Sequence, residues 1–174
     1  MHPATPAAPA ESDLKADIDH RYFEDYLPGA SASYGPIEVS AEEIVEFARK
    51  FDPQEFHVDA ERAASGPFGG LVASGWHTAS LMMRLLVDRY LSKVASLGSP
   101  GVDELRWLAP VRPGDRLWVR IHVIEARRSQ SKPDRGLVRS AIDVCNQRGE
   151  TLMTVKAMTL MRCRTSMPAG GTAT

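Results

Sequence analysis

Two runs of sequence decide the fold, and they separate two helical patterns: Phe51-Asp52-Pro53-Gln54-Glu55-Phe56-His57 and Phe68-Gly69-Gly70-Leu71-Val72-Ala73-Ser74-Gly75-Trp76. The first run holds a carboxylate and an imidazole five positions apart, and the second leads through glycines into an apolar helix. In a continuous α-helix, residues at i and i+5 point well apart. Pro53 disfavours helical dihedral angles at the preceding residue, so we expect a helix to end at Asp52. This break lets Asp52 and His57 turn toward one space.

The segments on either side of Asp52 predict helices with defined starts. Ser40 and Glu43 have the spacing of a capping box, followed by apolar residues on one face, which predicts an amphipathic surface helix ending at Asp52. Asp59 is placed to cap a short helix that runs through Ala64.

The second run opens a more apolar helix, predicted over residues 74–91. Its polar side chains form only a narrow stripe of His77, Arg84 and Asp88. A helix this apolar is expected to be surrounded by protein rather than to rest on its surface. Ser74 is the expected N-cap, in preference to a nucleophile, because no Gly-x-Ser-x-Gly elbow surrounds it.

Alternating apolar residues predict five strands, over 33–40, 102–109, 115–125, 137–145 and 152–161. Short turns between the consecutive later strands indicate an antiparallel sheet. The economical packing is α+β, with a curved antiparallel sheet wrapped around the apolar helix. Such a sheet leaves edges to cover, and pairing with a second copy is a common solution, so we expect a homodimer or higher homo-oligomer.

Length and composition fit a single domain over 13–164 with disordered tails at 1–12 and 165–174. The formal net charge of −1 argues against a nucleic-acid binder. No apolar run approaches the roughly 20 residues of a membrane span, and no signal peptide is evident, so we expect a cytoplasmic protein. Cys145 and Cys163 lack metal-ligand spacing, so we expect free thiols and no metal site.

The two opening runs, in this order and ahead of an apolar helix, resemble the MaoC-like dehydratases, also described as (R)-specific enoyl-CoA hydratases. The segment Leu105–Asp115 is similar to the strand and turn after the central helix in that family. The family signature Gly-Asp-x-Asn-Pro-x-His keeps its acid and imidazole here, with Phe51, Gln54 and Glu55 at its other positions. The resemblance covers roughly 37–161 and implies a hot-dog fold, a curved antiparallel sheet around a long buried central helix.

The resemblance implies a hydro-lyase that adds water reversibly to an α,β-unsaturated acyl thioester, as an enoyl-CoA hydratase or 3-hydroxyacyl-CoA dehydratase does. Asp52 and His57 would be catalytic and hold one water between them. We expect Asp52 to accept the water proton while His57 orients the water and shuttles the proton; the sequence leaves the reverse assignment open. Phe51 and Phe56 suggest an apolar surround that would raise the pKa of Asp52.

The second run supplies the expected substrate-binding residues. The backbone N–H of Gly75, at the start of the apolar helix, would donate to the thioester oxygen, because helix N-termini carry free N–H groups and partial positive charge. A glycine there would also let substrate approach closely. Phe68, Gly70, Ser74 and Trp76 are expected to contact substrate. We expect no separate cofactor, since coenzyme A enters as part of an acyl-CoA or acyl-carrier thioester.

Basic residues cluster around one predicted loop, at Arg127, Arg128, Lys132 and Arg135. They either meet the phosphates of coenzyme A or form a solvated basic loop, and the sequence leaves both open.

Two other functions compete with hydration. The first is a hot-dog thioesterase, which would release free thiol instead of consuming the conjugated double bond. The second is a non-catalytic acyl-thioester binding protein, which the presence of both Asp52 and His57 disfavours. The sequence does not reveal acyl length, CoA or carrier-protein preference, or pathway.

Overall fold

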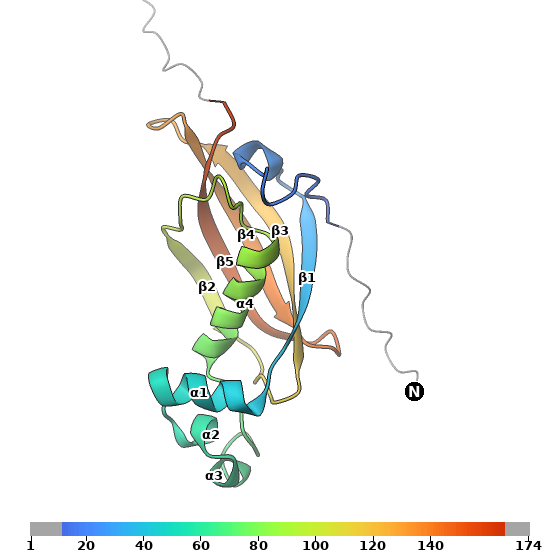
Figure 1. Ribbon diagram of the computed structural model, residues 1–174, viewed down its shortest axis with the longest axis vertical. Helices are drawn as coiled ribbons and strands as arrows, with labels where there is room; N and C mark the ends of the chain where they lie inside the picture. Colours follow the sequence, from blue (N-terminus) through green and yellow to red (C-terminus); the bar gives the residue numbers. More distant parts are fainter. Residues whose placement is uncertain (1–11, 166–174) are drawn as a thin grey trace, which may run out of the picture.

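The computed structural model describes residues 12–165, in which a five-stranded sheet carries one long helix on its face (Figure 1). Most of the two tails expected to be disordered, residues 1–11 and 166–174, lie outside the described residues. The elements are η1 Phe23–Asp25, β1 Ser31–Glu38, α1 Ala41–Phe51, α2 Glu55–Val58, α3 Ala60–Ala64, α4 Gly75–Arg89, β2 Gly101–Trp107, β3 Arg116–Arg128, β4 Arg135–Cys145 and β5 Thr151–Arg162.

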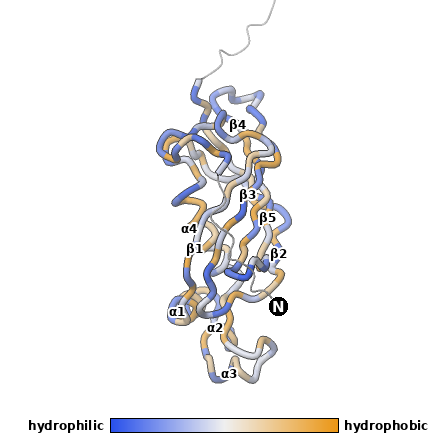
Figure 2. The backbone as a smooth tube through the Cα atoms, turned by 90° about the vertical axis from the view of Figure 1, so that its right-hand side faces the viewer, coloured by the Kyte–Doolittle hydropathy of each residue, from blue (hydrophilic) through white to orange (hydrophobic). Residues whose placement is uncertain are grey.

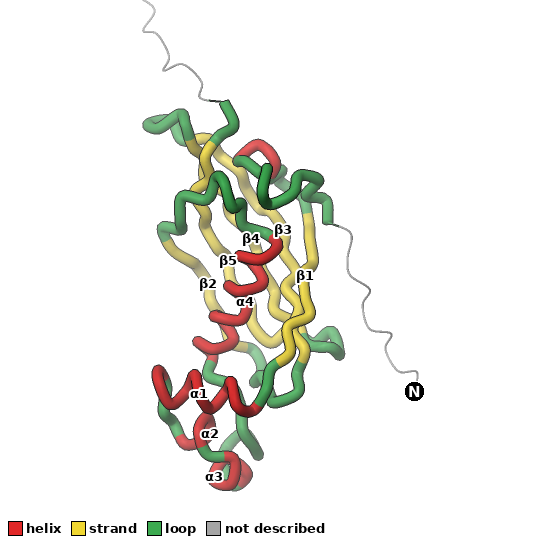
Figure 3. Tube along the Cα trace, in the orientation of Figure 1, coloured by secondary structure: helices red, strands yellow, loops and turns green. Residues whose placement is uncertain are grey.

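The sheet has the strand order β1-β3-β4-β5-β2, and every neighbouring pair is antiparallel. Both α4 and the sheet run along the length of the molecule, while α1, α2 and α3 gather at one end (Figure 3). The five predicted strands, their antiparallel pairing and the α+β architecture are confirmed. The strands β3 and β5 extend beyond their predicted bounds because their polar outer positions continue the pairing.

The core lies between the sheet and α4. Leu117, Val119, Ile121 and Val123 alternate along β3 and are at most 3% exposed, as the period-two pattern predicted. Hydrophobic and hydrophilic residues are accordingly interspersed along the chain (Figure 2). The buried residues of α4 are His77, Thr78, Met82, Leu85 and Leu86, of which Met82, Leu85 and Leu86 belong to this core.

The prediction that α4 is surrounded by protein is wrong for one of its faces. Trp76, Met83 and Val87 are 59%, 45% and 49% exposed, and their spacing places them on one stripe of the helix. The sheet covers only the opposite side. His77, a member of the polar stripe, is buried because α1 packs over it through Phe47.

No helix within residues 12–165 has the length and apolar character needed to cross a membrane. In the same residues, Cys145 and Cys163 are buried free thiols.

Candidate active site

Asp52 lies at the C-terminal end of α1, where Pro53 interrupts the helix as predicted. Its backbone N–H donates to the Ala48 carbonyl at 2.8 Å, and its φ of −153° leaves the helical region. Three side chains then surround the carboxylate. Ser74 Oγ donates to Oδ2 at 2.7 Å, Gln54 Nε2 donates to Oδ1 at 2.7 Å, and His57 Nε2 lies 3.4 Å from Oδ2. The expected convergence of Asp52 and His57 is therefore present.

His57 is held in α2 with only 6% exposure. Its Nδ1 lies 2.7 Å from the Val72 carbonyl oxygen. A carbonyl can only accept, so Nδ1 carries the proton and donates. In the neutral ring, Nε2 then presents a lone pair on the side that faces Asp52. The site offers two acceptors side by side, a carboxylate oxygen and an imidazole nitrogen.

The expected rise in the pKa of Asp52 is wrong. The hydrogen bond from Ser74 is the largest influence and lowers the pKa of this carboxyl below its ordinary value. Burial opposes this decrease, and the bond from Gln54 adds to it. Phe51 is 63% exposed, so it does not shield the Asp52 carboxylate from water. Asp52 is thus a stabilised anion, and the amide of Gln54 contributes directly to this state.

A cleft of about 430 Å³ opens beside the pair. Of the expected substrate-binding residues, Phe68, Ser74, Gly75 and Trp76 line it together with Asp52 and His57, whereas Gly70 is not among its lining residues. Gly70 serves the turn instead, because its φ of +149° is rarely adopted by other residues. Sequence reasoning gave no site role to one wall, formed by Trp107, Leu108, Ala109, Pro110 and Val111.

Residues 27–143 match the family described as MaoC like domain. The chain belongs to the MaoC-like dehydratase family. The predicted family and its hot-dog fold are therefore confirmed, and the family supports a hydratase or dehydratase activity in general.

Solved structures show the same fold. A MaoC-like dehydratase from Rhodospirillum rubrum is 42% identical, with a TM-score of 0.77, covering 83% of this chain and 99% of that one. An R-hydratase from Pseudomonas aeruginosa, at 23% identity and a TM-score of 0.69, covers 90% of this chain and 97% of that one and shows the fold alone. Among curated relatives, 3-hydroxyacyl-thioester dehydratase Z of Mycobacterium tuberculosis is 40% identical over 83 residues, 47% of this chain and 55% of the relative's length.

Within this MaoC-like domain, position 75 requires glycine because a neighbouring side chain leaves no room for a Cβ atom. A Cβ at Gly75 would lie 2.5 Å from Cε2 of Trp107, so the indole occupies the room that substrate was expected to use. The N–H of Gly75 has no hydrogen-bond acceptor among residues 12–165. It remains available as a donor at the N-terminus of α4, where the helix dipole is positive.

The basic residues considered for coenzyme A lie around the β3–β4 connection, at the end of the molecule opposite α1 and α2 (Figure 1). Arg127, Arg128 and Arg135 form ion pairs with Glu125, Glu24 and Asp134 respectively. Their charges are largely compensated within the chain, which favours the solvated-loop interpretation for the single chain.

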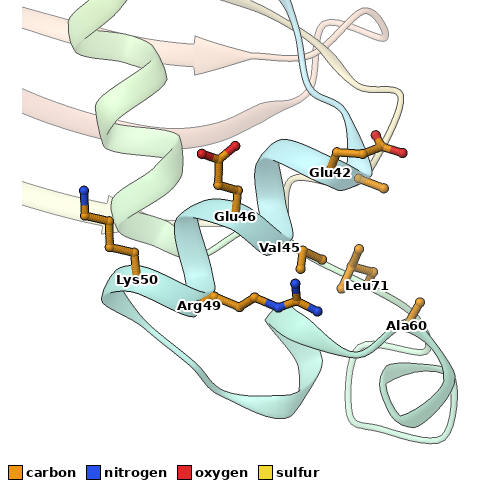
Figure 4. A pocket seen from close by; sticks show the side chains of 8 residues that line it. Glu42, Val45, Glu46, Arg49, Lys50, Ala60 and Leu71 are labelled. Atoms are coloured by element: carbon orange, nitrogen blue, oxygen red, sulfur yellow. The ribbon is translucent and has the colours of Figure 1, made fainter.

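A second hollow of about 670 Å³ lies along α1 (Figure 4). Apolar side chains meet there, from Val45, Ala60 and Leu71, with charged side chains of α1 around them. It contains neither Asp52 nor His57, and its charged residues, Glu42, Glu46, Arg49 and Lys50, are exposed. Although it is larger, its chemistry gives it no catalytic role.

Proposed function

We propose that this protein is a hydro-lyase that reversibly adds water to an α,β-unsaturated acyl thioester. The observation that carries the proposal is the pairing of Asp52 Oδ2 and His57 Nε2, 3.4 Å apart, in a cleft that includes the first residue of α4. Two acceptors can take both hydrogens of one water molecule, which leaves a lone pair of its oxygen free to attack. Two curated relatives, a 3-hydroxyacyl-thioester dehydratase and a 3-hydroxybutyryl-CoA dehydratase, support the same reaction class.

The hydrogen bonds favour His57 as the group that takes the water proton. Asp52 is held as an anion by Ser74 and Gln54, so it is a weak base, but it stabilises an imidazolium beside it. The water oxygen bonds to Cβ as its proton passes to Nε2. The electron pair of the double bond moves onto the thioester oxygen, which accepts from the Gly75 N–H. The imidazolium then returns one proton to Cα, so no proton is gained or lost.

The substrate enters as an acyl-CoA or an acyl-carrier thioester, and coenzyme A in this case belongs to the substrate. Apolar side chains of the cleft, such as Phe56, Phe68 and Leu108, give the acyl or pantetheine chain a non-polar surround. We also propose that the protein works as a homodimer. β2 is an edge strand, and α4 exposes the stripe of Trp76, Met83 and Val87.

Substitution of the pair tests the reaction. Asp52→Asn and His57→Gln should each reduce hydration of a short enoyl-CoA by about 10²–10⁴-fold, the usual contribution of general acid–base groups. Asp59→Asn is the matched control, because Asp59 caps α3 and does not line the cleft. Loss of the conjugated enoyl absorbance reports hydration. Release of free thiol at the same rate would establish a thioesterase instead, and unchanged hydration in either variant would remove the assignment.

A further inference from the structure

Trp107, the last residue of β2, makes direct contact with the first residue of α4. Its indole Nε1 donates to the Gly75 carbonyl oxygen at 2.9 Å. A Cβ at Gly75 would lie 2.5, 2.6 and 2.8 Å from Cε2, Nε1 and Cδ2 of this ring. The φ of Gly75 is not in the left-handed region, so space and not backbone conformation requires glycine. The two residues therefore fit one another.

The indole is itself fixed to the sheet. Trp107 pairs with Met153 of β5, and the next residue, Leu108, donates its N–H to the Leu152 carbonyl at 2.8 Å. On its other side, the ring of Trp76 meets it edge-to-face, with ring centroids 5.3 Å apart. Trp107 consequently connects the N-terminus of α4 to the sheet.

The position of that N-terminus decides where the Gly75 N–H lies. From the side of α1, the first turn is fixed by Ser74 and its bond to Asp52. From the side of the sheet, Trp107 Nε1 reaches the Gly75 carbonyl oxygen. We propose that Trp107 is a positioning residue, which holds the start of α4 so that the Gly75 N–H meets the thioester oxygen of the substrate.

This inference rests on the proposed function and adds a residue to it. A donor to a developing oxyanion acts in the transition state more than in the bound substrate, so misplacing it lowers kcat. A residue that only lines the substrate cleft would raise KM when changed. A residue that only stabilises the fold would lower the melting temperature and leave kcat of the folded enzyme unaltered.

The test compares Trp107→Phe with wild type in hydration of one enoyl-CoA. The phenyl ring keeps aromatic bulk and removes the Nε1 donor. We expect kcat to fall about tenfold and KM to stay within about twofold, given the usual strength of one hydrogen bond and the sensitivity of catalysis to geometry. Trp118→Phe is the matched control, since Trp118 lies on β3 away from the cleft, and its kcat should equal that of wild type.

A double-mutant cycle measures the fit of the two residues. Gly75→Ala should lower kcat strongly while the indole is present, and much less in the Trp107→Ala background, where the ring no longer meets the added methyl group. If the kcat losses of Gly75→Ala and Trp107→Ala simply multiply in the double variant, or if only KM changes, Trp107 is not a positioning residue. Turnover by wild type would still uphold the hydro-lyase in that case. A wild-type protein that hydrates no enoyl thioester would overturn both.

Discussion

Ser74 Oγ donates a 2.7 Å hydrogen bond to Asp52 Oδ2 and also accepts from the Trp76 N–H at 3.3 Å. One hydroxyl thus caps the N-terminus of α4 and stabilises the carboxylate at the C-terminus of α1. The two preceding residues, Val72 and Ala73, also hydrogen-bond to other segments of the chain. Val72 accepts from His57, and Ala73 donates to the Val111 carbonyl at 2.9 Å. The short segment before α4 therefore connects both acceptors of the site to the rest of the fold.

Replacing Ser74 with alanine should shift the acid side of the pH–rate profile. The hydroxyl lowers the pKa of Asp52, so without it the carboxylate protonates at a higher pH. We expect the acid limb of kcat/KM to move to higher pH and the helix cap to lose about 1 kcal/mol of stability. Ser80→Ala is the control, because the Ser80 hydroxyl donates to the Trp76 carbonyl and, among residues 12–165, does not contact Asp52. An acid limb that stays in place in Ser74→Ala would contradict the role of this bond.

Much of this arrangement follows from local sequence. The Ser40–Glu43 capping box, the helix end before Pro53 and the Asp59 cap all form as predicted, because each depends on residues a few positions apart. The alternation along β3 likewise gave the correct buried face. These features need no knowledge of what lies across the molecule.

The remaining features depend on residues distant in sequence. The low pKa of Asp52 depends on Ser74, and the need for glycine at 75 depends on Trp107, neither of which a local pattern reveals. Composition also cannot distinguish a helix face that enters the core from one left exposed on the surface. For this reason the sequence wrongly predicts that the stripe beginning at Trp76 is buried.

His77 should make stability fall as the medium becomes acidic. Burial lowers the pKa of its imidazole below the ordinary 6.5, and Nδ1 has no hydrogen-bond partner among the described residues. Above about pH 6.5 the ring is neutral in both folded and unfolded chains. Below that, the unfolded chain takes up the proton first, so stability declines until the pH passes the folded pKa.

His77→Phe should flatten this decline, because phenylalanine keeps the stack on Phe47 and does not titrate. Urea unfolding at several pH values between about 5 and 8 measures it. The exposed His20 provides the control, and His20→Gln should retain the wild-type slope. A slope in His77→Phe as steep as in wild type would assign the pH dependence to another group.

Arg21 should be important for stability because it holds the C-terminal end of α4. Its guanidinium is buried, with the residue only 4% exposed, and donates to the carbonyls of Ala16 and Tyr90 at 2.7 and 2.8 Å. Arg21→Met takes the guanidinium donors from both carbonyls and leaves the Tyr90 carbonyl with the Tyr26 hydroxyl, which donates at 2.8 Å. We expect a loss of about 2–4 kcal/mol in unfolding free energy. Arg49→Met, at an exposed site, should change it by less than about 0.5 kcal/mol.

Arg21→Lys tests whether charge alone is sufficient. A lysine ammonium cannot reproduce the planar guanidinium that donates to the Ala16 and Tyr90 carbonyls together, so stability should recover only in part. Full recovery with lysine would show that geometry is unimportant here.

The exposed stripe of α4 should be the surface that a second copy covers. Met83 and Val87 are 45% and 49% exposed, and apolar area of this kind contributes to association when water is removed from it. Wild type should therefore elute with a light-scattering mass near twice the 19.1 kDa of the chain. Met83→Glu and Val87→Glu should shift it toward the single-chain mass, because the interface would have to bury carboxylates without partners.

The control for this prediction is Ile124→Glu, which places the same charge on an exposed apolar residue of β3, away from α4. It should leave the mass unchanged. Dissociation by Ile124→Glu but not by Met83→Glu would move the interface to the outer face of the sheet. A single-chain mass for wild type at the concentrations used in the assay would instead contradict the homodimer, and it would make the exposed stripe of α4 a feature of the working monomer.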